Sequence, residues 1–285
     1  MVTAKVVADS LASHGVRLTT MALRYPRFIH SEVMTHRAFS RNASSSRAIP
    51  LAKYRAEVRR EPALPVFWGR NRKGMQATEP LVGWRLRAAR FTWWLALQGA
   101  CILHWALERL ELHKQLANRI LEPWSHITVI VTATDWENFY ALRTDGGAQP
   151  EIRALAEAML AAQNASTPVL APYWHLPFVS VEEADRIGWD QAKRTSVARC
   201  ARVSYNNHEG KPSTPAEDNR LYEQLVGKQP MHASPAEHQA RESAFGPEGY
   251  HRNLRGWVSL RVLLPNDTIK YFPALIRHKR FGKSW

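Results

Sequence analysis

Hydrophobic and polar positions alternate near the N-terminus, and the pattern then changes to helical spacing. Residues 16–24, VRLTTMALR, alternate as the two faces of a half-buried strand do. In the following PRFIHSEVMTHR, Ile29, Val33 and Arg37 share one helix face. We therefore expect a strand and a helix that lead into a polar loop at residues 34–50.

Longer helical patterns occupy the middle of the chain. Residues 83–121 carry apolar or small side chains at helical spacing, and we expect Pro123 to end this helix. The stretch SHITVIVTATDWENFYALR combines a β-branched run with the spacing of a buried helix, and we interpret it as helix. PEIRALAEAMLAAQ predicts another helix, with Pro150 at its first position.

Mixed and turn-rich stretches separate these elements. Residues 51–81 are rich in turn signals, and we interpret about 50–90 as a surface insertion. Residues 206–218 predict a loop, and a helix that carries Leu221 and Leu225 is expected to start there. HLPFVSV and the tail NLRGWVSLRVLL each predict a strand.

The composition is that of a globular protein with anionic partners. The 285 residues are 45% hydrophobic and 22% charged, with 11 Trp, which excludes a disordered chain. A net charge of +14 favours nucleotides, polyphosphate cofactors, nucleic acid or an acidic membrane surface, without choosing among them. The N-terminus lacks a signal-peptide pattern and no window reaches the roughly 18–20 apolar residues of a membrane span, so we expect a soluble cytoplasmic protein.

Several reaction classes lack their motifs here. Cys101 and Cys200 form neither a disulfide framework nor a metal cluster, which favours a reducing compartment, and neither lies in an electropositive loop. The sequence has no G-x-G-x-x-G, Walker or G-x-S-x-G motif. A Rossmann dinucleotide site, a P-loop and a serine hydrolase are therefore disfavoured.

The polar loop, MTHRAFSRNASSSRAIP, contains hydrogen-bond donors and no acidic residue. Its polar side chains are His36, Arg37, Ser40, Arg41, Asn42, Ser44, Ser45, Ser46 and Arg47. Guanidinium groups and hydroxyls of this kind suit a phosphate. A solvated basic loop explains the same residues equally well.

A second polar cluster is HASPAEHQ at residues 232–239. Its histidines lack the H-E-x-x-H spacing of a helical zinc site and no cysteine assists them, which disfavours zinc. Ser234, followed by Pro235 and Glu237, predicts an N-cap and a capping box at the start of a helix.

Two further segments carry arginines near apolar residues. LANRILEP places Arg119 on an apolar helix face, where an acidic partner and an anionic ligand are equally good explanations. WENFYALRTDGGAQPEIR contributes Asn138, Arg143 and Gln149.

Together these segments resemble the flavin-dependent thymidylate synthases, the ThyX family, whose signature is R-H-R-x-x-S-x-N-E-x-S-x-R. The matching run here is Thr35, His36, Arg37, Ser40, Asn42, Ala43, Ser45 and Arg47. Thr35 stands where the first signature arginine belongs, and Ala43 stands where the glutamate belongs. Arg41, one residue before Asn42, is near enough in sequence to supply the charge that Thr35 lacks.

The order of the segments differs from that of the family. The family's alanine-arginine-valine-serine strand and its histidine-glutamate-histidine segment precede the signature, whereas their counterparts here follow it at residues 201–238. This is the pattern of a circular permutation, which is tolerated where the original termini lie close together. The resemblance implies an α+β, ThyX-like fold, with an antiparallel sheet packed with long helices, in one catalytic domain over residues 1–285.

The resemblance also implies a reaction and its site. The family makes dTMP from dUMP with methylenetetrahydrofolate, FAD and NADPH, in a homotetramer whose subunits share each site. The implied catalytic residues are Arg143, which would polarise the uracil, and Ser45. The implied substrate-binding residues are Glu32, Ser45, Ser46, Arg47, Arg119 and Arg143. The implied FAD-binding residues are His36, Arg37, Ser40, Asn42, Asn138, His232, Ser234 and Glu237.

Two alternatives stay open at this point. Thr35 and Ala43, with Glu32 where the family often has glutamine, are compatible with methylation or hydroxymethylation of another pyrimidine nucleotide. A basic nucleic-acid-binding protein with tryptophans for stacking is the alternative of another class. It is disfavoured because the aromatic residues have core-like helical spacing and the basic residues are spread along the chain. We therefore expect neither nucleic acid nor a membrane as a partner.

Overall fold

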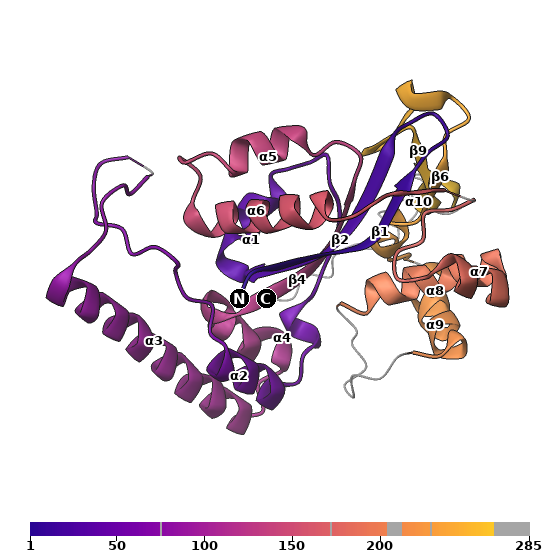
Figure 1. Ribbon diagram of the computed structural model, residues 1–285. Coiled ribbons are helices and arrows are strands. Elements are labelled where there is room, and N and C mark those ends of the chain that lie inside the picture. The colour runs from indigo at the N-terminus through magenta and orange to yellow at the C-terminus, as the bar shows by residue number, and fades with distance from the viewer. Residues whose placement is uncertain (75, 172, 204–212, 229, 265–285) are drawn as a thin grey trace, which may run out of the picture.

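The computed structural model describes residues 1–74, 76–171, 173–203, 213–228 and 230–264. A five-stranded sheet with the strand order β3-β4-β2-β1-β5 lies at its centre (Figure 1). The strands are β1 (Thr3–Leu11), β2 (Arg17–Pro26), β3 (Ser40–Ala43), β4 (His126–Ala133) and β5 (Val169–Leu170). All neighbouring pairs are antiparallel except β1 and β5. The α+β class with an antiparallel sheet is thus confirmed.

Helices surround this sheet on both faces. The α-helices are α1 (His30–Met34), α2 (Leu51–Arg60), α3 (Gly83–Arg109), α4 (Lys114–Ala117), α5 (Glu137–Arg143), α6 (Pro150–Asn164), α7 (Val181–Ile187), α8 (Trp189–Ala201), α9 (Pro215–Tyr222) and α10 (Leu260–Leu263). Short 3-10 helices are η1 (Arg27–Ile29), η2 (Ser46–Ala48), η3 (Asn118–Trp124), η5 (Ser234–Glu237) and η6 (Gly246–Glu248), and η4 (Glu223–Gly227) is a π-helix. Two small sheets pair β6 (Ala240–Glu242) with β9 (Trp257–Ser259), and β7 (Tyr250–His251) with β8 (Leu254–Arg255).

One face of the central sheet is apolar and is covered by α5 and α6 (Figure 1). Successive strand residues point to opposite faces, so alternate residues of β2 and β4 supply this face. Its buried members include Met21, Leu23, Tyr25, Val129, Val131, Ile152, Leu155 and Met159. The predicted helix at α6 is confirmed, and Pro150 stands at its first position.

The other face of the sheet carries buried polar groups. The Thr20 and Thr132 hydroxyl oxygens lie 2.7 Å apart, and each is 2.8 Å from a buried histidine nitrogen, His175 Nε2 and His238 Nδ1 respectively. His175 Nδ1 lies 2.8 Å from Ser10 Oγ and so extends the chain onto β1. A continuous line of buried hydrogen bonds therefore crosses this face.

The helix predicted over SHITVIVTATDWENFYALR is wrong for its first part, which forms β4, and confirmed for its last part, which forms α5. Residues 126–133 form a central strand that pairs with β2 on one side and β3 on the other. A strand buried on both faces carries apolar residues without strict alternation, so its periodicity resembles that of a buried helix. β1 was not predicted at all, and a bulge between Val6 and Ala8 interrupts its alternation.

The single helix expected over residues 83–121 is wrong beyond its first part. α3 ends at Arg109, and Glu111 then adopts a left-handed backbone conformation with φ 59°. Pro123 lies inside η3 and does not end the helix. Residues 51–60, expected in a surface insertion, form α2, whose Tyr54 and Val58 are buried against α3 and η3.

Predictions for the C-terminal half were confirmed in part. HLPFVSV forms no strand, because His175 makes only a single bridge to Ala240 before the chain turns. The tail contains β8 and β9, and then α10. Part of the loop predicted at 206–218 lies outside the described residues, and its last four residues belong to α9. The helix expected to carry Leu221 and Leu225 is present as α9 and η4. Over the described residues, no helix is both long and apolar enough to cross a membrane.

Candidate functional site

The polar loop and the 232–237 segment meet at a cavity of about 440 Å³. The described residues that line this cavity, the loop cavity, are Asn42, Ala43, Ser45, Arg47, Ala48, His113, Gln115, Ala201, Leu225, His232, Ser234 and Pro235. They include one guanidinium and two imidazoles, and none of them is a carboxylate. Such a lining suits an anionic ligand.

Strand β3 positions the first wall of the loop cavity. Asn42 pairs with Ile130 of β4, and Ser40 pairs with Thr132, so both face the polar side of the sheet. The Asn42 side-chain amide donates to the Cys200 carbonyl at 2.9 Å and accepts from Ser234 Oγ at 3.3 Å. Asn42 thereby ties β3 to α8 and to η5.

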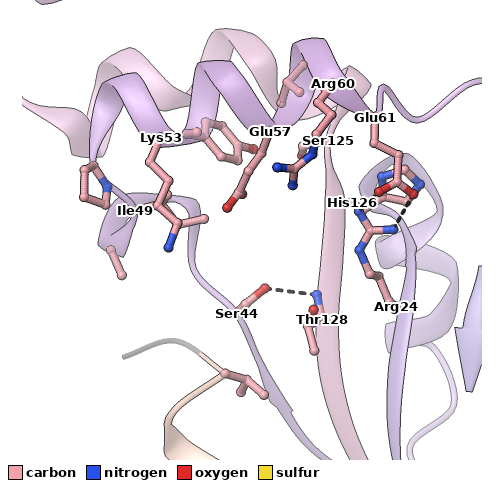
Figure 2. Close-up of a pocket in the computed structure, with 15 residues that line it drawn as sticks. Arg24, Ser44, Ile49, Lys53, Glu57, Arg60, Glu61, Ser125, His126 and Thr128 are labelled. Atoms are coloured by element: carbon pink, nitrogen blue, oxygen red, sulfur yellow. Dashed lines mark hydrogen bonds and ion pairs between the residues drawn. The ribbon is translucent and has the colours of Figure 1, made fainter. Parts of the chain in front are cut away.

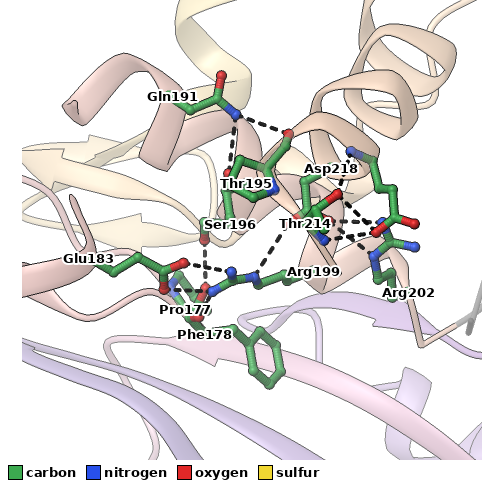
Figure 3. A network of polar contacts seen from close by, with 12 residues as sticks. Pro177, Phe178, Glu183, Gln191, Thr195, Ser196, Arg199, Arg202, Thr214 and Asp218 are labelled. Carbon is green, nitrogen blue, oxygen red and sulfur yellow. Dashed lines mark hydrogen bonds and ion pairs between the residues drawn. The ribbon is translucent and has the colours of Figure 1, made fainter. Parts of the chain in front are cut away.

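The end of α8 forms a second wall of the cavity, and ion pairs hold it in place (Figure 3). Arg199 binds both carboxylate oxygens of Glu183, at 2.8 and 2.6 Å, and lies 3.5 Å from Asp218. Arg202 donates to the fully buried Asp218 at 2.9 Å. The alanine-arginine-valine-serine segment was implied to be a strand, but Ala201 ends helix α8 and Arg202 and Val203 form a turn. Ser204 lies outside the described residues.

Donors in the loop cavity remain available to a ligand. Arg47 is exposed, and its Nε donates weakly to Ser45 Oγ at 3.4 Å. His232 exposes its imidazole, while its backbone N–H donates to the Leu225 carbonyl at 2.7 Å. The guanidinium and the imidazole can therefore both reach a group in the cavity.

A second group of predicted residues lies at α5, which covers the apolar face of the sheet. Arg143 Nε donates to His36 Nε2 at 2.9 Å, so His36 accepts there as a neutral imidazole. Burial lowers the pKa of His36, and the nearby Arg143 and Arg41 lower it further. Burial raises the pKa of Glu32, and Arg143 opposes that rise. His36, Arg143 and Glu32 do not line the loop cavity.

Arg41 lies beside the position where the signature has its first arginine. Its Nη1 donates to the carbonyl oxygens of Met34 at 2.7 Å and His36 at 3.1 Å, on either side of Thr35. Its side chain thus places a positive charge against this turn. The Thr35 hydroxyl donates to the Glu32 carbonyl at 2.7 Å.

Two predicted substrate residues are engaged by one glutamate. The buried Ser46 hydroxyl donates to Glu122 Oε1 at 2.6 Å, and Arg119 donates to the same oxygen at 2.9 Å. Of the two explanations for Arg119, the structure provides the acidic partner. Arg37 and Asn138 are exposed and line none of the three cavities described in this section.

Ser40 and Glu237 line a different cavity, of about 310 Å³, together with residues 251–254 and Ser259. Glu237 forms an ion pair with Arg261 at 2.5 Å. The predicted capping box at η5 is therefore wrong. Ala233 occupies the N-cap without a side-chain cap bond, because Ser234 bonds to Asn42 and Glu237 to Arg261.

A third cavity, of about 410 Å³, lies between α2 and β4 (Figure 2). Lys53, Glu57 and Arg60 point from α2 toward Ser44 and Thr128. None of the predicted site residues lines it, and it shares only Ala48 with the loop cavity. The spacing of the three α2 residues by four and three positions was a sequence signal for one helix face.

Two polar residues of the loop cavity were missed by the sequence reasoning. His113 and Gln115 lie at the start of α4, where the break after α3 brings them to the cavity. They belong to no motif, and residues 83–121 were expected to be continuous helix. A break signalled only by a left-handed glutamate leaves no clear pattern in the sequence.

Neither cysteine has the surroundings of a nucleophile. Cys101 and Cys200 are buried, and burial raises the pKa of both thiols. A buried thiol with a raised pKa is inert at neutral pH. Neither thiol is therefore a candidate nucleophile.

Comparison with known proteins identifies one matching family. Residues 16–169 match the model of Thy1, thymidylate synthase complementing protein, which covers more than half of the chain. No curated protein matches the chain. Residues 201–238 lie outside the family match, and Ser234 in this part of the chain is hydrogen-bonded to Asn42 of the polar loop.

Similar solved structures include two at low sequence identity. Both are of the UMP/dUMP methylase PolB from Streptomyces cacaoi, one bound with 5-Br dUMP and the other with 5-Br UMP. Each is 16% identical to this chain, with TM-scores of 0.48 and 0.47. The alignments cover 57% of this chain and 90% and 88% of those chains. A likeness of this size carries no conclusion about the substrate.

Proposed function

Since the chain belongs to the Thy1 family of thymidylate synthase complementing proteins, the ThyX family, we propose that it is a flavin-dependent nucleotide methylase. The proposed reaction converts dUMP to dTMP with a methylene group from methylenetetrahydrofolate. The main support is the loop cavity, which combines Arg47, His113 and His232 with no carboxylate among its described lining residues. These cationic and neutral donors favour a phosphate group, of the substrate nucleotide or of the cofactor.

We assign the nucleotide to Ser45, Arg47 and Arg143, with Glu32 near Arg143. Ser46 and Arg119 would contact it only by giving up their hydrogen bonds to Glu122. Arg47 is the exposed guanidinium of the loop cavity and would fork onto phosphate oxygens. Arg143 uses Nε for His36, and its terminal nitrogens make no hydrogen bond to a described residue. They would polarise a uracil carbonyl, which is the role implied by the family.

FAD is the proposed cofactor, and the residues present fit it. The loop cavity offers the exposed His232 imidazole for a polar group and apolar side chains for a ring, and the bonded pair Asn42 and Ser234 lies in its wall. The proposed FAD set is His36, Arg37, Ser40, Asn42, Asn138, His232, Ser234 and Glu237. Bound FAD, reduced by NADPH, supplies the hydride that completes the methyl group. The chain's own residues bind and orient the reactants.

A homotetramer with shared sites fits the division of the predicted residues. The loop cavity lies on the polar side of the sheet, whereas His36 and Arg143 lie at α5 on the apolar side. One subunit therefore does not collect the whole set in one cavity. A neighbouring copy would supply the second group.

The test is a product assay on the FAD-loaded chain. We would incubate it with dUMP, methylenetetrahydrofolate and NADPH and identify the nucleotide by mass spectrometry. The expected product is dTMP. Arg47→Ala should lower kcat/KM for dUMP by at least about tenfold, because a charge-assisted phosphate contact contributes roughly 1.5–3 kcal/mol. Arg59→Ala, an exposed arginine on α2 outside all three cavities, is the matched control.

Thr35 and Ala43 support one second candidate, modification of a different pyrimidine or arrest at a hydroxymethyl product. The same assay with UMP in place of dUMP, and a search for the hydroxymethyl mass, separates this candidate from the first. A chain that cannot be loaded with FAD, and that forms none of these products, contradicts both. Salt-sensitive binding of single-stranded DNA would then favour the nucleic-acid alternative.

A further inference from the structure

Helix α3 exposes a regular stripe of large side chains. This stripe, the α3 seam, consists of Trp84, Ala88, Phe91, Leu95, Gln98, Ile102, Trp105 and Arg109. Its members are separated alternately by four and three residues. The five large apolar members are exposed by between 52% and 68%, and Gln98 is half-buried.

The opposite side of α3 is held against its own molecule. Leu97, Cys101 and His104 are buried on that side. His104 Nε2 lies 2.9 Å from Asn118 Oδ1, and its Nδ1 lies 3.0 Å from Arg55 Nη1. These contacts fix the rotation of the helix and leave the seam exposed. Figure 1 shows α3 at the edge of the molecule.

The seam is too apolar for a surface that stays in water. A fully buried aromatic side chain removes about 200 Å² from solvent, so the exposed parts of Trp84, Phe91 and Trp105 amount to roughly 350 Å². Leu95, Ile102 and the neighbouring Trp94 add to this area. Contiguous exposed apolar patches of this size mark interaction surfaces.

The spacing of the seam indicates a helical partner. Apolar positions that alternate by four and three residues repeat every seven residues, which is the repeat of a two-helix coiled coil. The repeat persists over eight positions from Trp84 to Arg109. Membrane-surface helices present a wider apolar face, with cationic residues confined to the other side. Gln98 and Arg109 lie within the seam itself, so polar residues are not confined to the other side of α3, which favours a helix over a lipid surface.

The seam is complementary to itself when the second helix runs in the opposite direction. Antiparallel pairing about the point between Leu95 and Gln98 places Ala88 opposite Trp105 of the second copy, so a small residue faces a large one. It also places Phe91 opposite Ile102. The seam occupies two of the seven heptad positions. In this arrangement each residue at one of these positions faces a residue at the other position in the second copy, as in antiparallel coiled coils.

The ends and the centre of the seam suit the same pairing. Trp84 meets Arg109 of the second copy, which is a cation–π pair. Arg109 already lies near an indole in the monomer, with its guanidinium carbon 5.9 Å from the Trp105 ring centroid. Leu95 meets Gln98 of the second copy on each side of the twofold axis. Gln98 is thus the polar residue near the centre of the pair, and it would fix the register of the two helices.

We propose that α3 is a self-association surface through which two copies of the chain form an antiparallel helix pair. Thr92, Gly99 and Ala106 flank the seam on one side, and these small side chains let the two backbones approach. No atom lies within 4 Å of a Cβ placed on Gly99, so this flank is open. This surface lies apart from the loop cavity, none of whose described lining residues belongs to α3.

Sedimentation of the full chain tests this surface. The double variant Leu95→Glu/Ile102→Glu places four charges at the centre of the pair and should halve the mass measured for the unmodified chain. Leu103→Glu is the matched control, because Leu103 is 62% exposed on the same helix and lies off the seam. The control should keep the parent mass. An unchanged mass in the double variant, with its circular dichroism also unchanged, overturns the proposal.

Disulfide trapping tests the direction of the pair. Chains with Phe91→Cys, mixed with chains with Ile102→Cys, should form a mixed disulfide dimer on mild oxidation. The unmodified chain, whose two cysteines are buried, is the control. Homodimers of the Phe91→Cys chain alone would indicate a parallel pair and overturn the antiparallel arrangement. An unmodified monomer that binds phosphatidylserine vesicles through the seam would overturn self-association. Flavin content and product formation are measured separately, so failure here and failure of the proposed reaction are distinguishable.

Discussion

The two faces of the central sheet come from alternate residues of the same strands, yet they are built differently. On the face under α5 and α6, Met21 and Leu23 pack with Leu155 in an apolar core. On the opposite face, Thr20 and Thr132 join buried imidazoles through hydrogen bonds of 2.7 and 2.8 Å. A period of two residues thus lets one strand serve a packed core and a polar layer at once.

The difference explains where the loop cavity lies. Apolar packing is non-directional and tolerates changes of shape, whereas each buried polar atom needs a partner in a fixed direction. Asn42 and Ser40 face the polar side, where hydrogen bonds to Cys200 and Ser234 hold the cavity walls. The apolar face therefore supports stability, and the polar face positions the candidate site.

The largest expected effect is on the apolar face. Leu155→Ala removes a fully buried side chain under the sheet, and it should lower the free energy of unfolding by about 2–5 kcal/mol. Urea unfolding monitored by circular dichroism measures the loss. Val181→Ala is the control, because Val181 is an exposed apolar residue on α7, and its change should stay within about 0.5 kcal/mol. Equal losses at the two positions would contradict the comparison.

Acid should destabilise the folded protein through the two buried histidines of the polar face. Burial lowers the pKa of both His175 and His238 to about 3. In the unfolded chain each histidine titrates near 6.5, so their stabilisation is complete above that pH and is lost as pH falls toward 3. Between pH 6.5 and 3, each of the two histidines should lower the free energy of unfolding by about 1.4 kcal/mol for every pH unit of acidification. Urea midpoints from pH 7 to 5 measure the slope.

Substitution of the histidines separates this effect from general acid sensitivity. His175→Asn/His238→Asn should flatten the slope even though the double variant is less stable at pH 7. His232→Asn, which changes an exposed imidazole, should leave the slope of the parent chain intact. A slope that is the same in all three chains would show that the buried pair does not cause it.

A single hydroxyl on the polar face should matter less than either change. Thr132→Val keeps the shape and removes the group that joins Thr20 to His238. His238 Nε2 already has no hydrogen-bond partner among the described residues, so its ring would lose the partner of Nδ1 as well. We expect a loss of about 1–3 kcal/mol in urea unfolding. Thr128→Val, on the same strand but half-buried, should cost less, and the reverse order would contradict the chain of hydrogen bonds.

The smallest effect on stability, with a clear effect on binding, is expected at the cavity wall. Ser234→Ala removes one long hydrogen bond to Asn42 and should cost no more than about 1 kcal/mol. It should nevertheless weaken FAD binding, measured by flavin fluorescence titration, because the hydroxyl lines the loop cavity. Ser31→Ala, at an exposed position on α1, is the control. Unchanged flavin affinity in Ser234→Ala would remove Ser234 from the proposed cofactor set.

Local signals predicted some elements and failed at others for identifiable reasons. β2 alternates and α6 begins with proline, so both were found from short windows of sequence. β4 is apolar on both sides because it lies between β2 and β3, and no local pattern shows those neighbours. Ser234 has the local context of an N-cap, but Asn42, which is 192 residues away, takes its hydroxyl.

The sequence by itself determined the kinds of group that the molecule presents. The donors of the polar loop, its lack of acidic residues and the seven-residue repeat on α3 are all properties of spacing and residue type. Only the tertiary structure decided which donors stay available. The Ser46 hydroxyl donates its hydrogen bond to Glu122, 76 residues away, whereas Arg47 beside it remains exposed in the loop cavity. A hydrogen bond depends on the distance and direction between two groups in space, and the chain brings such groups together only when it folds.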